Sequence, residues 1–161
     1  MYQIPTTNLS IGTEQDLIQN FGNQEFAIVN VAGNLHAKIL GYRARSGDPY
    51  YILYKKDRIL SVNFVDGDDP KYYDWQGGGV SVFTQILDFI DDQKDKKVLI
   101  NCNQGISRSP SVAMLYLAKR SKLITNNSFD SAMQEFTRIY PNYTPGLGIR
   151  LFLSQNWEIL K

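Results

Sequence analysis

The residues best suited to covalent chemistry lie in one short stretch, VLINCNQGISRS, at positions 98–109. It holds the only cysteine of the chain, Cys102, followed six residues later by Arg108 and then by Ser109. The apolar run that ends at Cys102 predicts a buried strand, and Pro110 is typical of the first turn of a helix. A loop between such a strand and helix directs successive backbone N–H groups at one point, where the helix dipole adds positive charge.

This loop therefore has the composition of an anion-binding nest. Gly105 lets the backbone curl tightly, and Arg108 can hold two oxygens of a phosphate-like group. At the base of the nest, the N–H groups and the guanidinium should lower the pKa of Cys102 below the free value of about 8.5. A thiolate there can attack phosphorus, and Ser109 can donate a hydrogen bond to the sulfur when it leaves. The alternative is a small core cysteine, but a core cysteine does not need glycine and arginine at these spacings.

The elements around the loop predict an α/β fold. Continuous apolar runs predict buried strands at 26–32 and 58–64, and residues 41–62 are interpreted as a hairpin in which 50–54 is a strand. Helical spacing predicts helices from Val80 to the DDQKDKK stretch, at 111–121, at 126–140 with Asn127 or Ser128 as cap and Pro141 as stop, and at 146–160. We expect one domain over 1–161, in three layers, with helices flanking a mixed, mostly parallel central sheet.

Composition excludes several classes of protein. The 161 residues can bury a core without disulfides, and 43% are hydrophobic. Because 17 basic residues nearly balance 16 acidic ones, no overall charge draws the chain to nucleic acid or a membrane surface. No apolar run is long enough to span a membrane, and the start lacks the features of a secretory signal. With a single cysteine, these features indicate a cytoplasmic protein.

The stretch around Cys102 resembles the signature of the cysteine-dependent protein phosphatases, His-Cys-x5-Arg-Ser/Thr. Its Gly-x-Ser-Arg-Ser part looks like the dual-specificity branch. NLSIGT, IVNVA and FDSAMQEFTRIYPNY are similar to that branch's opening strand, its Val-Leu-Asn-Val strand and its helix after the loop. The resemblance implies the protein tyrosine phosphatase-like fold, with a phosphate or sulfate as the natural occupant of the loop.

The resemblance also implies roles for individual residues. Cys102 would be the nucleophile, Arg108 the phosphate clamp and Ser109 the partner of the thiolate. The cradle would be formed, together with Arg108, by the backbone of the loop residues Asn103, Gln104, Gly105, Ile106 and Ser107.

Phosphate-ester cleavage also needs a proton donor for the leaving oxygen and then a base for water. In the family this is an aspartate on a loop, which corresponds here to NFVDGDDP with Asp66, Asp68 and Asp69 as candidates. Similarity to the branch's Ile-Pro-Val-x-Asp pattern selects Asp66. The alternative is that these aspartates are ordinary turn residues beside glycine and proline.

Asn101 departs from the pattern, because the family has histidine at this position. An asparagine side chain can donate and accept hydrogen bonds to hold the loop backbone, but it carries no charge. We expect Cys102 to remain a nucleophile with a higher pKa than in the histidine-bearing relatives. The alternative is a phosphate-binding module without turnover.

The loop interior contains no lysine or arginine. In the family that this stretch resembles, branches that act on phosphoinositides or RNA 5′-triphosphates tend to have basic or otherwise distinctive residues there, so the resemblance implies a phosphomonoester on protein. We expect a phosphorylated protein or peptide as partner, phosphotyrosine first, with phosphoserine and phosphothreonine as further substrates. The same mechanism on an inositide, nucleotide or phosphosugar is the alternative. No cofactor and no metal are expected. The long region 33–57, with Arg43, Arg45, Lys55 and Lys56 among tyrosines, is interpreted as a solvated surface hairpin, and the alternative is a hairpin at the rim of the pocket that reads substrate. His36 is interpreted as a surface or packing residue.

Overall fold

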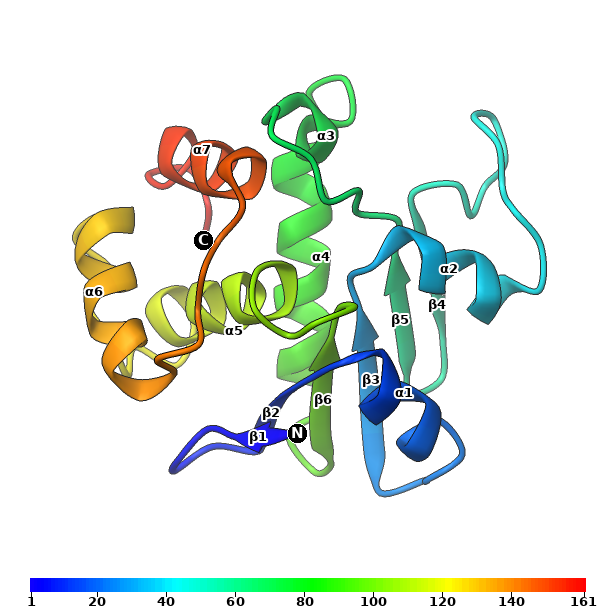
Figure 1. Ribbon diagram of the computed structural model, residues 1–161, viewed down its shortest axis with the longest axis horizontal. Coiled ribbons are helices and arrows are strands. Elements are labelled where there is room, and N and C mark those ends of the chain that lie inside the picture. Colours follow the sequence, from blue (N-terminus) through cyan, green and yellow to red (C-terminus); the bar gives the residue numbers. More distant parts are fainter.

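A six-stranded sheet forms the centre of the structure, a computed structural model that describes residues 1–161 (Figure 1). Three neighbouring pairs in the middle of the sheet are parallel and the two edge pairs are antiparallel, as expected for a mixed, mostly parallel sheet. Across the sheet the strands are β1 (Tyr2–Gln3), β2 (Leu9–Gly12), β6 (Lys97–Asn101), β3 (Phe26–Asn30), β5 (Ile59–Val62) and β4 (Leu53–Lys56).

The two central strands, β3 and β6, are buried almost throughout their length. Only Lys97, at the start of β6, is exposed. Strands covered on both faces read as continuous apolar runs rather than as an alternation, which is why the sequence pattern identified both. Their carboxyl ends lie side by side, because Asn30 pairs with Asn101 in parallel register.

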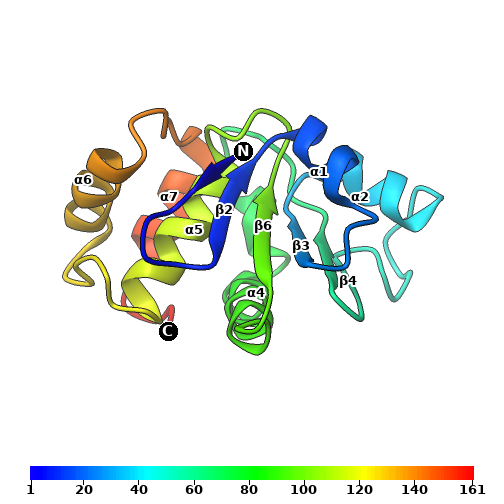
Figure 2. The ribbon, with the colours of Figure 1, turned by 90° about the horizontal axis from the view of Figure 1, so that it is seen from below.

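Seven helices surround the sheet. They are α1 (Glu14–Asn20), α2 (Gly33–Leu40), α3 (Lys71–Asp74), α4 (Gly79–Asp92), α5 (Arg108–Lys119), α6 (Phe129–Ile139) and α7 (Leu147–Gln155). Figure 2 shows α1 and α2 on one side of the sheet and α4 on the other. The chain crosses from β3 to β5 through α2 in one direction and returns from β5 to β6 through α4. Right-handed crossovers in opposite directions place these helices on opposite faces.

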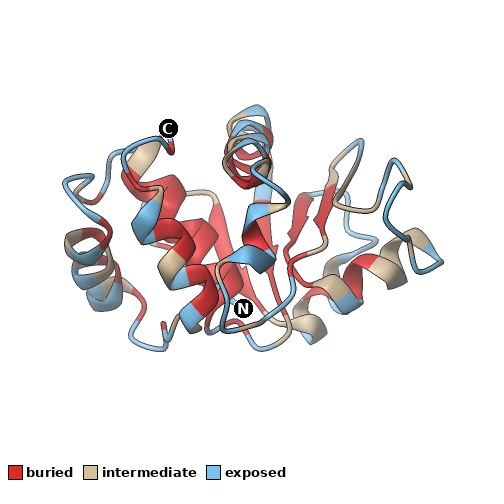
Figure 3. Ribbon diagram, turned by 90° about the horizontal axis from the view of Figure 1, so that it is seen from above, coloured by how far each residue is buried: buried red, intermediate tan, exposed pale blue.

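Burial is greatest in the central strands and in α5, which are red in Figure 3. Every residue of α5 from Arg108 to Ala118 is buried, because α5 contacts β2 and β6 on one side and α6 on another. Ser128 caps α6, as expected, by accepting a hydrogen bond from the Ser131 N–H. No helix is both long and apolar enough to cross a membrane.

The region between β3 and β5 differs from its prediction. Residues 33–40 form α2, which the sequence pattern did not reveal, and the hairpin is the short pair β4–β5. The strand predicted at 50–54 begins only at Leu53. The cause is a turn at Asp48, whose carboxylate and carbonyl accept hydrogen bonds from the N–H groups of Tyr50 and Tyr51. Those two amides are therefore lost to a strand ladder.

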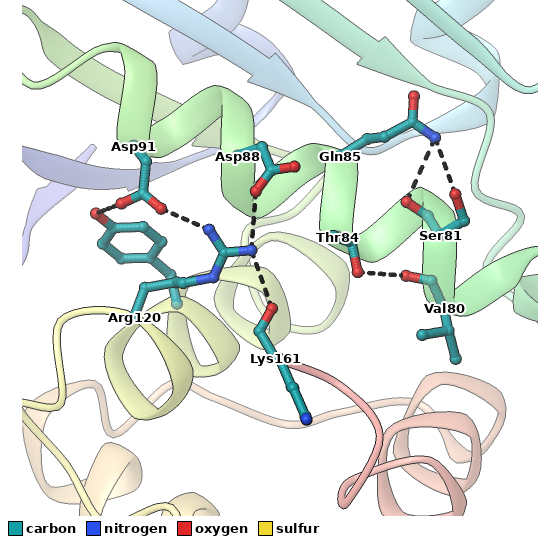
Figure 4. A network of polar contacts seen from close by, with 9 residues as sticks. Val80, Ser81, Thr84, Gln85, Asp88, Asp91, Arg120 and Lys161 are labelled. Carbon is teal, nitrogen blue, oxygen red and sulfur yellow. Dashed lines mark hydrogen bonds and ion pairs between the residues drawn. The ribbon is translucent and has the colours of Figure 1, made fainter.

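An ion-pair cluster joins α4 to the end of α5 (Figure 4). Arg120 donates to Asp91, to Asp88 at 2.9 Å and to the Lys161 main-chain carbonyl at 2.9 Å. Tyr116 also donates to Asp91, at 2.8 Å. These contacts fix the far end of the helix whose first residue is Arg108.

Candidate active site

The segment 102–107 connects the carboxyl end of β6, one of the two central strands of the sheet, to the start of α5. It is braced from two sides. The Cys102 N–H donates to the Gly12 carbonyl at 3.4 Å, next to the start of α1. From the other side, the Tyr140 hydroxyl donates to the Gly105 carbonyl at 2.7 Å and the Thr144 N–H donates to the Ile106 carbonyl at 2.7 Å. These bonds fix the curl of the loop.

Gly105 has the left-handed backbone conformation that the curl requires, with φ 71°. A Cβ atom at this position would also lie 3.2 Å from the Gly12 carbonyl oxygen. Both constraints select glycine. In this conformation the Gly105 N–H donates a hydrogen bond to the sulfur of Cys102.

Cys102 forms part of the floor of a hollow of about 320 Å³. Although the residue is only 2% exposed, its sulfur faces this hollow with the Gly105 N–H at 3.3 Å and the Ser109 hydroxyl at 3.2 Å. The other residues around the hollow are Asp66, Asn103, Gln104, Ile106, Ser107, Arg108, Thr144 and Gly146. The structure thus places Cys102, Arg108, Asp66 and most of the predicted loop residues around one hollow, and Gly105 and Ser109 contact the Cys102 sulfur.

The pKa of Cys102 is lowered from its ordinary value by the balance of opposing effects. Burial raises the pKa by penalising the charged thiolate. Hydrogen bonds from the Ser109 hydroxyl and backbone N–H and from the Gly105 N–H lower it, as does the charge of Arg108, and these outweigh burial. The sulfur is therefore held toward its ionised, nucleophilic form.

Ser109→Ala is expected to raise the pKa of the Cys102 thiol. The hydroxyl is the largest of the contributions that lower this pKa, so its loss reduces the thiolate fraction at neutral pH. Ultraviolet absorbance of the thiolate, titrated across neutral pH, should show the midpoint moving upward. Ser111→Ala, in the same helix but bonded to Tyr143, is the control. An unchanged midpoint in Ser109→Ala would contradict the assignment of this hydroxyl.

Arg108 is only 6% exposed, and its guanidinium is held in place by two acceptors. One terminal nitrogen, Nη1, donates to the Phe64 carbonyl at 2.9 Å, and the other, Nη2, donates to the Asn103 side chain at 2.8 Å. The buried Nε–H has no partner. A buried charged donor without an acceptor is costly, and a phosphate oxygen at the hollow would satisfy it.

Of the three candidate aspartates, Asp66 is the one at the hollow. Its carboxylate lies 3.9 Å from Nη2 of Arg108 and is about half exposed. Asp69 instead accepts a hydrogen bond from the Lys71 N–H at the start of α3 and lies 3.7 Å from the Lys71 ammonium. Asp68 is exposed and lies outside the hollow.

Comparison with known protein families identifies the family to which the chain belongs. The model of the family described as "Dual specificity phosphatase, catalytic domain" matches residues 44–145, more than half of the chain. The chain belongs to the dual specificity phosphatase family. The assignment to the dual-specificity branch made from the sequence is thereby confirmed.

Individual relatives match over shorter segments. Dual specificity protein phosphatase 5 of Homo sapiens is 40% identical over 65 residues, which are 39% of this chain and 17% of that protein. MAP kinase phosphatase with leucine-rich repeats protein 2 of Dictyostelium discoideum is 33% identical over 86 residues, 53% of this chain and 11% of that protein. The matched segments thus span less than a fifth of the length of these two relatives.

Solved structures of dual specificity phosphatases and related proteins share the fold at low identity. A leucine rich repeat and phosphatase domain containing protein from Entamoeba histolytica gives a TM-score of 0.63 at 18% identity, over 99% of this chain and 91% of that one. The human tyrosine phosphatase-like serine/threonine/tyrosine-interacting protein gives 0.59 at 18% identity, over 94% and 92%. The predicted protein tyrosine phosphatase-like fold is confirmed.

Asn101, the residue before Cys102, begins a buried series of hydrogen bonds. Its side-chain nitrogen donates to Asn30 at 3.0 Å, and Asn30 donates to the Ser61 hydroxyl at 2.9 Å. His36 lies 2.8 Å from that hydroxyl through Nδ1 and 2.7 Å from the Tyr50 carbonyl through Nε2. The carbonyl can only accept, so Nε2 carries the proton and Nδ1 accepts from Ser61.

This hydrogen-bond network corrects one expectation from the sequence and supports another. The Asn101 side chain makes no hydrogen bond to the loop backbone; it bonds instead to Asn30 across the strand pair. His36, 2% exposed, is the packing residue that was expected, and burial lowers its pKa and keeps it neutral. The network thus supports the end of β6 from the side of α2 without any charged group.

Two glycines that the sequence analysis left unassigned position the Asp66 loop. A Cβ atom on Gly148 would lie 2.1 Å from the Gly67 carbonyl oxygen, and one on Gly146 would lie 3.2 Å from the Asp66 carboxylate. The start of α7 therefore supports the loop by close backbone contact. The signal in the sequence was Gly148, which lies inside the first turn of α7, where glycine is less favourable than alanine.

Proposed function

We propose that this chain is a cysteine-dependent phosphatase that hydrolyses phosphotyrosine, and also phosphoserine and phosphothreonine, in protein substrates. One observation carries the proposal. A sulfur that accepts hydrogen bonds from Gly105 and Ser109 faces the same hollow as the unpartnered Nε–H of Arg108. Membership in the dual specificity phosphatase family supports the same activity.

In the first step, the Cys102 thiolate attacks the phosphorus of a monoester held by Arg108 and the loop amides of residues 103–107. The sulfur–phosphorus bond forms as the bond from phosphorus to the leaving oxygen breaks. Asp66, protonated, gives its proton to that oxygen, so the alcohol or phenol departs neutral. The product of this step is a cysteinyl-phosphate.

In the second step, the Asp66 carboxylate takes a proton from a water molecule, whose oxygen attacks the phosphorus. The phosphorus–sulfur bond breaks and inorganic phosphate forms. The electron pair returns to Cys102 as a thiolate, which the Ser109 hydroxyl stabilises at 3.2 Å. Neither of the two steps includes a redox change or uses an external cofactor.

The proposal extends to the chain as a whole. We infer one catalytic domain over 1–161, of which the family match covers 44–145. A cytoplasmic location fits a free, reduced cysteine at the centre of the site, since the thiolate must stay unoxidised to act. A phosphate or sulfate is the expected occupant of the loop when either is supplied.

Turnover on a substrate panel tests the proposal. The panel contains an aryl phosphate, peptides with each phosphorylated hydroxyl residue, phosphorylated sugars and nucleotides, and phosphoinositide vesicles. We expect the highest kcat/KM on phosphotyrosine peptides, and acid quenching should trap a phosphoryl group on Cys102. Higher kcat/KM on a soluble metabolite or on the vesicles would favour a non-protein substrate. Turnover no greater than that of Cys102→Ser would leave a phosphate-binding protein, the alternative that Asn101 raises.

Asp66→Asn is expected to lower kcat for a phosphotyrosine peptide by about 10²-fold. The loss should be much smaller for an aryl phosphate with a strongly acidic phenol, because that leaving group departs without a proton. Asp68→Asn, in the same loop but outside the hollow, is the matched control and should stay within about twofold of wild type. Equal losses on both substrates would show that Asp66 acts by holding Arg108 rather than as the acid.

A further inference from the structure

A second hollow, of about 650 Å³, lies directly beside the one that contains Cys102. The two share Asp66, Asn103 and Arg108 as a common wall. The far wall of the larger hollow is formed by the first turn of α2 and by the segment that follows α2, including Arg43. The mechanism proposed above uses the smaller hollow and leaves the larger one unassigned.

The charge of the larger hollow is positive. Arg43 and Arg108 both line it, and the only acidic side chain among its residues is Asp66, which already lies 3.9 Å from Arg108. Arg43 makes no hydrogen bond or ion pair with any residue of the chain. Its charge is therefore available for a ligand.

Neutral groups in the same hollow favour an anion as well. Asn34, Asn63 and Tyr51 also line it, and the Asn63 amide nitrogen donates to the Tyr51 carbonyl at 3.0 Å. The first turn of α2 adds the positive end of a helix dipole; its N-cap residue, Ala32, makes no side-chain cap hydrogen bond, and the Gly33 N–H donates to the Phe64 carbonyl at 2.9 Å. Arg108, whose Nε–H is assigned to the phosphate in the smaller hollow, forms part of the wall that the two hollows share. Two guanidinium groups, Arg43 and Arg108, thus line this hollow with a single carboxylate, Asp66.

We propose that this hollow is a second anion subsite, in which Arg43 binds a carboxylate or phosphoryl group of the substrate next to the phosphorylated residue. The inference rests on the proposed function, because the first phosphate must occupy the loop. A peptide whose phosphate lies in the smaller hollow continues across the shared wall of Asp66 and Asn103 into the larger one. The preferred substrate is then a phosphopeptide with an anionic neighbour.

Paired phosphopeptides test the subsite. Each pair compares an anionic peptide with a neutral one. Both peptides contain one phosphotyrosine and differ at one of the two residues before or after it, where the anionic peptide has Asp or phosphothreonine and the neutral peptide has Ala. We expect the anionic member of at least one pair to be hydrolysed with about five- to tenfold higher kcat/KM, through KM. In Arg43→Gln the ratio of anionic to neutral peptide should fall to about one. In Arg45→Gln, the same charge change two residues away and outside the hollow, the ratio should stay as in wild type.

The outcomes separate this inference from the proposed function. A wild-type ratio of one at every position, or equal losses in Arg43→Gln and Arg45→Gln, would overturn the subsite while aryl phosphate turnover still supported the phosphatase. If no substrate is turned over, fluorescence anisotropy of the same labelled peptides on Cys102→Ser measures the ratio as binding. Preference for phosphothreonine alone would identify the anion as a phosphoryl group, and equal preference for Asp would identify charge as the determinant.

Discussion

Cys102→Ser is expected to reduce turnover of an aryl phosphate by at least about 10⁴-fold, the scale of loss when a catalytic nucleophile is removed. The loop that lowers the pKa of the thiol cannot ionise a hydroxyl, because an alcohol has a far higher intrinsic pKa. The donors around the sulfur, Gly105 and Ser109, would therefore surround a neutral group.

The same substitution should leave phosphate binding intact or make it tighter. The thiolate is a negative charge beside a bound anion, and its removal relieves like-charge repulsion. Single-turnover kinetics and calorimetric titration with inorganic phosphate on the same preparation measure both effects, with thermal unfolding as the test that the variant is folded. Turnover within tenfold of wild type would mean that another group is the nucleophile, and loss of binding with the fold intact would mean that the sulfur has a structural role.

The sequence located the loop because its chemistry is local. Cys102, Gly105, Arg108 and Ser109 are separated by a few residues, and a strand followed by a helix is enough to arrange them. The central strands were equally accessible, since burial on both faces of a parallel sheet leaves an unbroken apolar run such as AIVNV. The helices from α4 onward follow from their spacing of apolar residues.

The contacts that fix the site come from distant parts of the chain, and sequence patterns do not reveal them. Phe64 accepts from Arg108 through a main-chain carbonyl, a group that every residue has. Ser107 accepts from the Gly146 N–H at 2.8 Å, which again depends on backbone placement alone. The α2 helix was missed for another reason: it begins at a glycine with no capping side chain before it.

Arg108→Lys is expected to lower kcat/KM by about 10³-fold, even though the positive charge is kept. The guanidinium uses one edge for the Phe64 carbonyl and the Asn103 side chain and still presents Nε–H to the hollow. An ammonium has one nitrogen and cannot be near both acceptors and two phosphate oxygens at once. The loss should therefore come from geometry rather than from charge.

Two measurements on one variant separate those causes. If geometry dominates, the thiolate midpoint of Arg108→Lys should stay close to that of wild type, because the charge of residue 108 is the smallest of the contributions that lower the pKa of Cys102. Turnover should nevertheless collapse. Arg138→Lys, at an exposed position of α6, is the matched control and should change neither quantity. If the midpoint rose in proportion to the lost activity, the guanidinium would act chiefly by ionising the sulfur, and the bidentate phosphate clamp would have to be abandoned.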